Sequence, residues 1–597
     1  CKNNNIKFPT YKKLIFKFNY NKSMSNDYVI RIGGAAGDGV QSAGYLLAKT
    51  FTRHGLHVFG YNYYQDLIRG GNSWYQVRVS EKKVKSQGDK LDILIALNED
   101  ALNRHTNPEI NEGGAPYLKG IAIFDESIKN YVKRDYVKYL ASPLMSIASK
   151  IGKNPLLKNT VALGMVIASL NLNLEIFLSA IKSTFKSKDL EENVEAARQG
   201  YNYYKTNYEI FGSLKINENK KMLMGGGEAV GLGAAVGGIK AYVAYPMTPA
   251  SSTLHWLSSH SKELDIFVKV PEDEISAINM VIGMNYAGIR AMTGSSGGGY
   301  DLMHEGVGLA AMLEVPVVIY ESQRAGPSTG LPTKTEQGDL LMIINSTHGD
   351  YPRAVIAPGD VEEAYYFTRE ALNLADIYQM PVIIVSDLYL SERLESIENL
   401  NLDFKIDRGL IANENEENFL RYKYTQNGIS PRAFPGMKGL MHNEDSDEHD
   451  ERGDVVSDAI TDPIKRKLSV EKRMKKLETL SKNLPAFKTY LLDDAELALI
   501  QWGSTKGVVE EAVEILRNIG IKAGAIEIKY IYPFNSQDFI KKSSGKKLIV
   551  VENNYSGQLA NLIKMFTGID TFKINKYNGE PFYPYEIVNE VRKIRGD

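Results

Sequence analysis

Alternation of short apolar strands with helical segments is the feature that most restricts the fold of this chain. The runs "PVVIYE", "RAVIAPG" and "PVIIVSD" have the length of buried strands, and segments with helical spacing of apolar residues separate them. Strands that are apolar on both faces need helices on both faces of their sheet. The sequence therefore predicts an α/β protein built on parallel sheets.

The composition describes a large globular chain without a bias toward nucleic acid or membranes. Its 597 residues, 43% of them hydrophobic and 24% charged, are enough for several domain cores. The net charge of −1 lacks the basic excess of nucleic-acid-binding proteins. No apolar run approaches the length of a membrane span, and "LIFKF" near the N-terminus is too short for a secretory signal. We expect a cytoplasmic protein that binds neither nucleic acid nor membrane.

A single cysteine, Cys1, restricts the metal chemistry. It excludes an intramolecular disulfide, a cysteine-rich zinc site and an iron-sulfur cluster held by four thiolates of this chain. We therefore predict no metal site here, and any redox metal must lie in a partner.

Shifts in composition divide the chain into segments of different kinds. We expect a disordered extension at 1–23, an α/β domain at 24–205, a linker at 206–220, a second α/β domain at 221–395, a charged connecting segment at 396–490 and a third α/β domain at 491–597. The connecting segment contains "NEDSDEHDERGD" at 443–454. Its acidic side chains and His449 could bind a cation, but a solvated acidic loop is the favoured interpretation.

The stretch "YVIRIGGAAGDGVQSAGYLLAK" predicts a strand, a glycine-rich turn and a helix, the start of a βαβ unit. Its glycines do not match the G-x-G-x-x-G pattern of dinucleotide-binding proteins. Gly37 and Gly39 are favoured as turn residues with positive φ, and phosphate or pantetheine contact at the helix N-terminus is a second possibility. A third is magnesium-diphosphate binding through Asp38 and Asn62, which is weaker because the expected pair of asparagines is missing.

The turn "YPMTP" at 245–249 follows an apolar strand directly. Proline fixes φ and is tolerated at the first helical position, so Pro249 is expected to begin a helix and Thr248 to cap it. The Thr248 hydroxyl can either cap that helix or face the region beyond the carboxyl end of the strand, where ligands bind in open α/β sheets.

Glu274 precedes a helix with one apolar arc. At about 100° per residue, Ile275, Ile278, Val281 and Ile282 mark that arc, and Glu274 falls within it. The pattern predicts a buried carboxyl group, which is unusual and suits a group that exchanges a proton.

Several motifs in order resemble the α subunit of the 2-oxoacid:ferredoxin oxidoreductases. They are "YPMTPASS", "EDEISAINMVIGMNYAGIRAMTGSSGGG", "QRAGPSTGLPTKTEQGDL", "RYKYTQNGISPRAFPG", "DEHDERG" and "EKRMKKLE". The residues before them resemble the family's γ domain, fused ahead of α. The resemblance runs from about Tyr28 to the end of the chain and implies a Rossmann-like γ domain, a thiamine diphosphate-binding pyrimidine domain and a transketolase C-terminal-like domain.

The resemblance also implies the reaction and the partners. The implied reaction is a CoA-dependent oxidative decarboxylation of a 2-oxoacid to acyl-CoA and carbon dioxide, with ferredoxin as the electron acceptor. Thiamine diphosphate would be shared with a β subunit, as in a heterodimer, and that subunit would hold Mg²⁺ and a [4Fe-4S] cluster. The substrate is left open between pyruvate, 2-oxoglutarate and a broad range, with 2-oxoglutarate slightly favoured by the fused layout.

Matching the motifs of this chain to those of the family implies which residues form the active site. Glu274 would activate the cofactor by sharing a proton with its aminopyrimidine ring, and Arg324 would bind the substrate carboxylate with its planar guanidinium. Thr248 and Thr333 would contribute to the substrate pocket. Cofactor contacts are expected at four positions: Gly37, Gly39, Ser295 and Ser296.

Two other classes of function stay open at this stage. The glycine-rich turns alone are compatible with a nicotinamide or flavin enzyme on Rossmann-like domains, which a nicotinamide requirement would reveal. A non-catalytic scaffold that binds acyl-CoA or a partner would tolerate substitution of Arg324 and Glu274.

Overall fold

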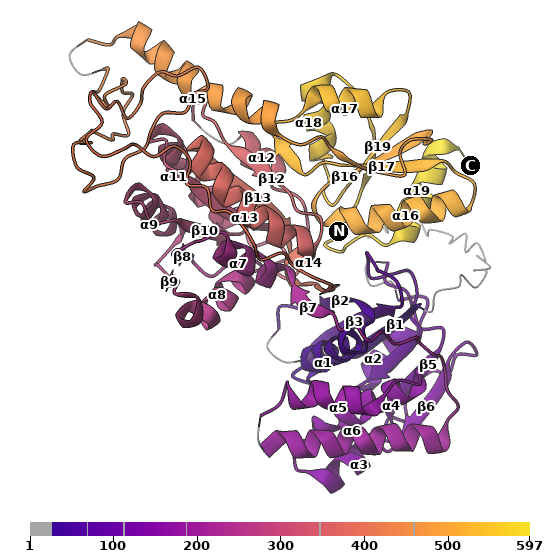
Figure 1. Ribbon diagram of the computed structural model, residues 1–597. Coiled ribbons are helices and arrows are strands. Elements are labelled where there is room, and N and C mark those ends of the chain that lie inside the picture. The colour runs from indigo at the N-terminus through magenta and orange to yellow at the C-terminus, as the bar shows by residue number, and fades with distance from the viewer. Residues whose placement is uncertain are drawn as a thin grey trace, which may run out of the picture.

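The computed structural model describes residues 27–596 except 68–69, 111–113, 187, 346–347 and 458–459. Three sheets organise these residues into an N-terminal, a middle and a C-terminal α/β unit (Figure 1). The extension expected at 1–23, with Cys1, lies outside the described residues. The division at 205, 220, 395 and 490 stays a prediction, and strands cross it, as described below.

The N-terminal unit contains an eight-stranded sheet in the order β6-β5-β4-β1-β3-β2-β14-β7. The expected βαβ unit is split, because β3 lies between β1 and β2 and is antiparallel to both. A short connection lets β3 fold back on β2 as a hairpin before the sheet continues in parallel. The elements are β1 (Asp27–Ala36), α1 (Val40–Arg53), β2 (His57–Tyr63), β3 (Gly70–Ser80), β4 (Ile93–Ala96), α2 (Glu99–Thr106), β5 (Ile121–Asp125), β6 (Lys138–Ser142), α3 (Leu144–Ile151), α4 (Leu157–Ser169), α5 (Leu174–Lys182) and α6 (Lys188–Asn207).

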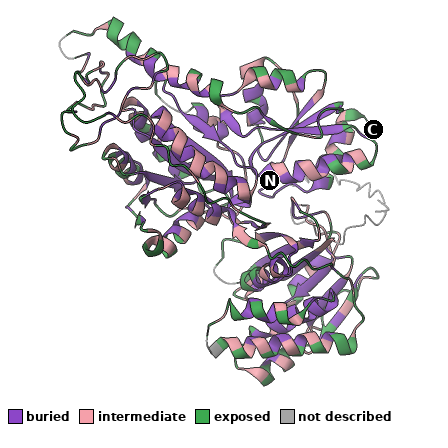
Figure 2. Ribbon diagram, in the orientation of Figure 1, coloured by how far each residue is buried: buried purple, intermediate pink, exposed green. Residues whose placement is uncertain are grey.

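The middle unit holds a seven-stranded sheet in the order β18-β12-β13-β11-β10-β8-β9. Its strands pair in parallel except at β18, and the residues of the central strands β11 and β13 are buried on both faces (Figure 2), as the apolar runs predict. The elements are β7 (Met222–Gly225), α7 (Gly226–Val236), β8 (Ala241–Val243), α8 (Ser251–Leu264), β9 (Phe267–Lys269), α9 (Glu274–Tyr286), β10 (Ala291–Ser295), α10 (Gly297–Leu302), α11 (His304–Met312), β11 (Val317–Gln323), α12 (Leu340–Asn345), β12 (Ala354–Ile356), α13 (Val361–Tyr378), β13 (Pro381–Asp387), α14 (Leu388–Glu392) and β14 (Leu394–Ile397).

The C-terminal unit is a five-stranded sheet in the order β15-β17-β16-β19-β20. It is joined to the middle unit because β18 pairs with β12, just as β7 and β14 join the middle unit to the N-terminal sheet. The elements are α15 (Pro463–Asn483), β15 (Lys488–Tyr490), β16 (Leu497–Gln501), a 3₁₀ turn (Gly503–Thr505), α16 (Lys506–Asn518), β17 (Ala523–Glu527), β18 (Tyr530–Tyr532), α17 (Ser536–Ser543), β19 (Lys547–Glu552), α18 (Gln558–Thr567), β20 (Phe572–Asn575) and α19 (Pro584–Arg595).

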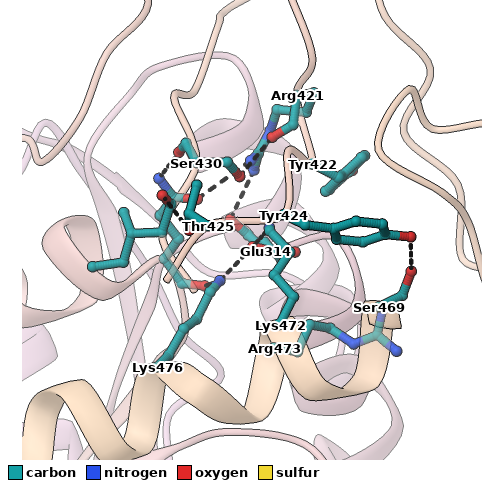
Figure 3. A network of polar contacts seen from close by, with 12 residues as sticks. Glu314, Arg421, Tyr422, Tyr424, Thr425, Ser430, Ser469, Lys472, Arg473 and Lys476 are labelled. Carbon is teal, nitrogen blue, oxygen red and sulfur yellow. Dashed lines mark hydrogen bonds and ion pairs between the residues drawn. The ribbon is translucent and has the colours of Figure 1, made fainter. Parts of the chain in front are cut away.

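The charged segment at 396–490 is anchored to the middle unit through Glu314, in the turn between α11 and β11. Glu314 is buried and accepts hydrogen bonds from Lys472 at 2.6 and 2.7 Å, and Lys476 lies 2.5 Å away (Figure 3). Arg421 donates to the backbone carbonyls of Leu313 and Glu314. We call Glu314, Arg421, Lys472 and Lys476 the Glu314 network. It holds α15 and the preceding loops against the sheet.

The acidic loop at 443–454 is part of this anchor. Glu444 is nearly buried and pairs with Arg421 at 3.1 Å, while Glu448 pairs with Arg473 at 2.7 Å. His449 is buried against the ring of Tyr422. Across the residues that the structure describes, no cluster of three histidine, cysteine or acidic side chains is arranged to hold a metal ion. Glu444 and Glu448 thus serve as ion-pair partners within the chain, while Asp447 and Asp454 are exposed to solvent.

Within the described ranges, no helix combines the length and the hydropathy needed to cross a lipid bilayer.

Candidate active site

The carboxyl ends of three neighbouring strands bring the predicted site residues together. β11, β10 and β8 are adjacent and parallel, so the loops that follow them meet at one edge of the sheet. β8 leads to the "YPMTP" turn, β10 to the "SSGGG" turn and β11 to Arg324. The segments at 245–249, 295–299 and Arg324, which are far apart in the sequence, therefore form one cluster.

Glu274 lies at the centre of this cluster. Asp273 caps α9 by accepting the Ser276 N–H, so the carboxyl group of Glu274 is not used as a cap. Glu274 is 3% exposed, and its Oε1 accepts the hydroxyl of Ser295 at 3.1 Å. The burial predicted for Glu274 is confirmed. The predicted arc is only partly correct, because Ile275 is 50% exposed while the other three residues are buried.

Ser295 connects Glu274 to the turn after β8. It is fully buried, and its hydroxyl also lies 3.8 Å from the sulfur of Met247. The neighbouring Ser296 is buried, and no hydrogen-bond partner is found for its Oγ among the described residues. A buried hydroxyl without a partner needs an explanation, and a ligand atom that accepts or donates a hydrogen bond would provide one.

Arg324 contacts Thr248 through the Thr248 backbone and not through its hydroxyl. The Nη1 of Arg324 donates to the carbonyl oxygen of Thr248 at 3.0 Å. The prediction that Thr248 caps a helix beginning at Pro249 is wrong. The chain turns over 248–250, α8 begins at Ser251, and the Pro249 carbonyl accepts the Ser252 hydroxyl. That extra turn leaves the Thr248 carbonyl free to orient Arg324.

Thr333 lies in the loop after Arg324 and is half-buried. The neighbouring residues fix this loop: Thr335 accepts the Tyr389 N–H, and Lys334 lies over the ring of Tyr63 and pairs with Glu580 at 3.1 Å. Contacts from all three units therefore converge on the loop that carries Thr333. A direct role of Thr333 in substrate binding stays a prediction.

Gly37 and Gly39 have the positive φ angles predicted for them, 100° and 77°. Asp38 between them accepts the Ala35 N–H at 2.8 Å, and its backbone carbonyl accepts Asn159. The Asp38 carboxylate thus stabilises its own turn, and Asn62 lies in β2, separated from β1 by β3. The magnesium alternative gains no support, and the turn interpretation explains the glycines.

Gly299 is required by the approach of α10 to the buried carboxyl. A Cβ at this position would lie 2.3 Å from Glu274 Oε1 and 2.1 Å from Ser295 Oγ. We expect Gly299→Ala to displace Glu274 and to lower stability by about 1–3 kcal/mol, with loss of turnover. Gly298→Ala is the matched control for stability alone, because its Cβ would meet no atom within 4 Å. Thermal unfolding of both variants would test this, and equal stability would exclude the clash.

Two carboxyl groups near the site are not among the predicted residues. Glu321 is fully buried at the end of β11, and Asp339 precedes α12. The available signal was an acidic residue inside the apolar run "PVVIYES". An acid in a strand buried on both faces is rare without a function or a partner.

Comparison with known proteins gives matches along almost the whole chain. Family models match residues 233–466 (pyruvate flavodoxin/ferredoxin oxidoreductase, thiamine diphosphate-binding), 29–203 (pyruvate ferredoxin/flavodoxin oxidoreductase) and 495–587 (pyruvate:ferredoxin oxidoreductase core domain II). The 2-oxoacid:ferredoxin oxidoreductase subunit alpha of a Sulfolobus species is 34% identical, covering 95% of this chain and 96% of that protein. The 2-oxoglutarate oxidoreductase subunit KorA of Mycobacterium tuberculosis is 30% identical over 94% of this chain and 91% of its own.

A solved structure has the same fold. It is the 2-oxoglutarate:ferredoxin oxidoreductase of Magnetococcus marinus with 2-oxoglutarate, coenzyme A and succinyl-CoA bound, 32% identical, with a TM-score of 0.88 over 95% of this chain and 99% of that one. The fold and the site thus define a thiamine diphosphate-binding oxidoreductase subunit. The chain belongs to the 2-oxoacid:ferredoxin oxidoreductase family, and its relatives over nearly the full length are alpha subunits.

The residues at the strand ends fit one side of a thiamine diphosphate site. Glu274 provides a buried carboxyl group, and Ser296 provides a buried hydroxyl for which no partner is found among the described residues. Gly298 is exposed, and no atom lies within 4 Å of the position of its missing Cβ, so a ligand could approach its backbone. These groups can hold and orient a nitrogen heterocycle.

Proposed function

We propose that this chain is the α subunit of a CoA-dependent 2-oxoacid:ferredoxin oxidoreductase and supplies half of the active site. The supporting observation is that Glu274 and Arg324 are each held by a hydrogen bond to a segment at the carboxyl ends of neighbouring strands, Glu274 to Ser295 and Arg324 to the Thr248 carbonyl. Thiamine diphosphate, when bound, supplies the electron sink for decarboxylation. Glu274 would hold a proton at the aminopyrimidine ring, and Arg324 would bind the substrate carboxylate.

A β subunit would complete the site and carry Mg²⁺ and the [4Fe-4S] cluster, with ferredoxin as acceptor. The surface next to Glu274 supports such a partner. β9 is an edge strand of its sheet, and large apolar side chains beside it are exposed. They are Tyr245, Phe267, Val270, Ile275 and Met280, between 36 and 56% exposed. A partner that covers this surface would also close the site around Glu274.

Reconstitution tests this assignment. We expect the isolated chain to be colourless and inactive, because it cannot hold an iron-sulfur cluster with one cysteine. A co-expressed β subunit should restore both colour and ferredoxin reduction on a panel of 2-oxoacids. 2-Oxoglutarate leads that panel because the solved structure of the Magnetococcus protein has it bound. An iron-sulfur spectrum from the isolated chain would contradict the proposal that the β subunit holds the cluster.

Arg324→Lys keeps the charge but loses the planar guanidinium. We expect substrate affinity to fall by roughly one to two orders of magnitude, with thiamine diphosphate affinity nearly unchanged. Steady-state kinetics on several 2-oxoacids would measure the effect, and cofactor titration serves as the internal control. Unaltered KM values throughout the panel would remove Arg324 from the carboxylate site.

The turn at Gly37 and Gly39 is our candidate for CoA contact, since a helix N-terminus with exposed backbone N–H groups favours phosphate. Gly37→Ala should lower acyl-CoA formation more than release of carbon dioxide. Gly520→Ala is the matched control, because both glycines have positive φ and open space at Cβ. Equal loss of both partial reactions in Gly37→Ala would leave this turn a structural role only.

A further inference from the structure

Glu321 and Asp339 lie against the segments that build the candidate site. Glu321 on β11 is in register with Ser295 on β10, the residue that donates to Glu274. The Asp339 N–H donates to Gln323 at 2.9 Å, and a Cβ on Gly297 would lie 2.3 Å from Asp339 Oδ2. The two acids therefore connect β11 and the "SSGGG" turn.

The two carboxyl groups are close enough for each to shift the pKa of the other. Neither oxygen of Glu321 accepts a hydrogen bond from any donor in the described part of the chain, and its neighbour is the carboxyl of Asp339. Two neighbouring carboxyl groups in a buried site oppose each other's ionisation, because like charges repel and neither charge is solvated. Burial and the nearby Asp339 raise the pKa of Glu321, and burial raises the pKa of Asp339 to about 6. Both effects favour the protonated form of Glu321, with the Asp339 carboxyl as its acidic neighbour.

Arg324 is the cation that acts on this pair. It lowers the pKa of Asp339 against the effect of burial, and so it stabilises the ionised form. The other titratable groups around the pair come from α10, from the loop before α12 and from the end of β13; they are Tyr300, Asp301, Glu336 and Asp387. Asp301, Glu336 and Asp387 oppose a further negative charge on the Glu321–Asp339 pair.

We propose that Glu321 and Asp339 are an acid pair that takes up a proton when an anionic substrate binds Arg324. The inference rests on the carboxylate-binding role proposed above for Arg324. A carboxylate on Arg324 neutralises the cation that keeps Asp339 ionised and adds a negative charge beside it. Both effects favour transfer of a proton from solvent to Asp339, forming one O–H bond. Glu321 and Asp339 act as positioning residues, and substrate affinity falls as the pH rises above the range in which Asp339 protonates.

Infrared difference spectroscopy tests the pair without any substrate. At pH near 7.5, the spectrum of the wild-type chain minus that of Glu321→Gln should contain the band of a protonated carboxyl group. Glu392→Gln is the matched control. Glu392 is half-buried, and desolvation raises its pKa to about 7, but it accepts the hydroxyl of Tyr64 in the N-terminal unit. The band in the Glu392→Gln difference spectrum should lie at a different frequency from the Glu321 band, because the Glu392 carboxyl has a different hydrogen-bond partner. Absence of a protonated band for Glu321 would overturn the proposal.

Calorimetry tests the coupling. 2-Oxoglutarate is titrated into the assembled complex in two buffers of different ionisation enthalpy. We expect uptake of roughly 0.5–1 proton per bound substrate in the wild type and in Glu392→Gln, and close to none in Asp339→Asn. A purely structural role would leave uptake unchanged in Asp339→Asn, which would refute the coupling. If the wild-type complex binds no 2-oxoacid, the proposed function and the coupling both fail, while the infrared band still decides whether the acid pair exists.

Discussion

Glu274→Gln should lower the rate of 2-oxoacid turnover by roughly two to four orders of magnitude while the fold and subunit assembly are preserved. The amide has nearly the same size as the carboxyl and can keep the Ser295 hydrogen bond, which the structure places at 3.1 Å. It cannot hold a transferable proton at the aminopyrimidine ring. Single-turnover kinetics and deuterium exchange at the thiazolium carbon of the bound cofactor would measure the loss.

Glu272→Gln is the matched control for this experiment. Glu272 is exposed two residues earlier and accepts only the hydroxyl of Ser276 among the described contacts. Its substitution should leave both rates within about twofold of the wild type, in line with other surface substitutions. If Glu274→Gln exchanges the cofactor proton and turns over substrate at the wild-type rate, Glu274 has no catalytic role.

The second large effect is expected at the Glu314 network. Glu314→Gln would leave Lys472 and Lys476 buried without their common counter-charge (Figure 3). Breaking a buried ion pair by removing one partner costs about 3–5 kcal/mol, because the remaining charges stay desolvated. We therefore expect α15 and the loops of 396–490 to detach from the middle unit at much lower denaturant concentration. Limited proteolysis in urea would report this detachment.

The pKa values in the network show why the carboxylate is needed. Burial, together with the other cations, lowers the pKa of Lys476 to about 7 and that of Lys472 to about 8, although Glu314 opposes this. Burial alone would raise the pKa of Glu314, but the lysines and Arg421 outweigh it and hold it below its usual range. Because the folded pKa of Glu314 is depressed, its contribution to stability is present above the ordinary pKa of a glutamate and is lost in acid.

A control on the same helix separates this effect from a change in surface charge. Glu478 is exposed and pairs with Lys475 at 2.6 Å. Exposed pairs of this kind contribute at most about 1 kcal/mol, so Glu478→Gln should unfold nearly like the wild type. Equal sensitivity of the two variants would mean that Glu314 does not anchor the segment.

Local patterns in the sequence were enough to predict the class of fold and part of the site. The apolar runs at β11 and β13 are long enough to require a buried parallel sheet, and they pair as such over seven residues. The position of Glu274 before an apolar helix predicted its burial, and the motifs around it predicted the family. These features depend on residues a few positions apart, and short-range sterics and hydrophobic burial decide them.

Other features depended on contacts between distant segments. Periodicity did not predict that β3 would separate β1 from β2, or that the Thr248 backbone would meet Arg324, 76 residues away. The exposure of Ile275 also depends on what packs against α9, and helical spacing alone cannot give that.

The sequence alone therefore determined that the chain forms parallel α/β sheets and has a buried glutamate at Glu274, and its single cysteine cannot supply the four thiolates of an iron-sulfur cluster. Only the tertiary structure decided which charges meet. Glu314 pairs with Lys472 across 158 positions, and Glu321 lies close enough to Asp339 for each to shift the pKa of the other. The physical reason is that the energy of a buried charge depends on its desolvation and on its nearest charges, and both are set by how the sheets and their connecting segments pack together.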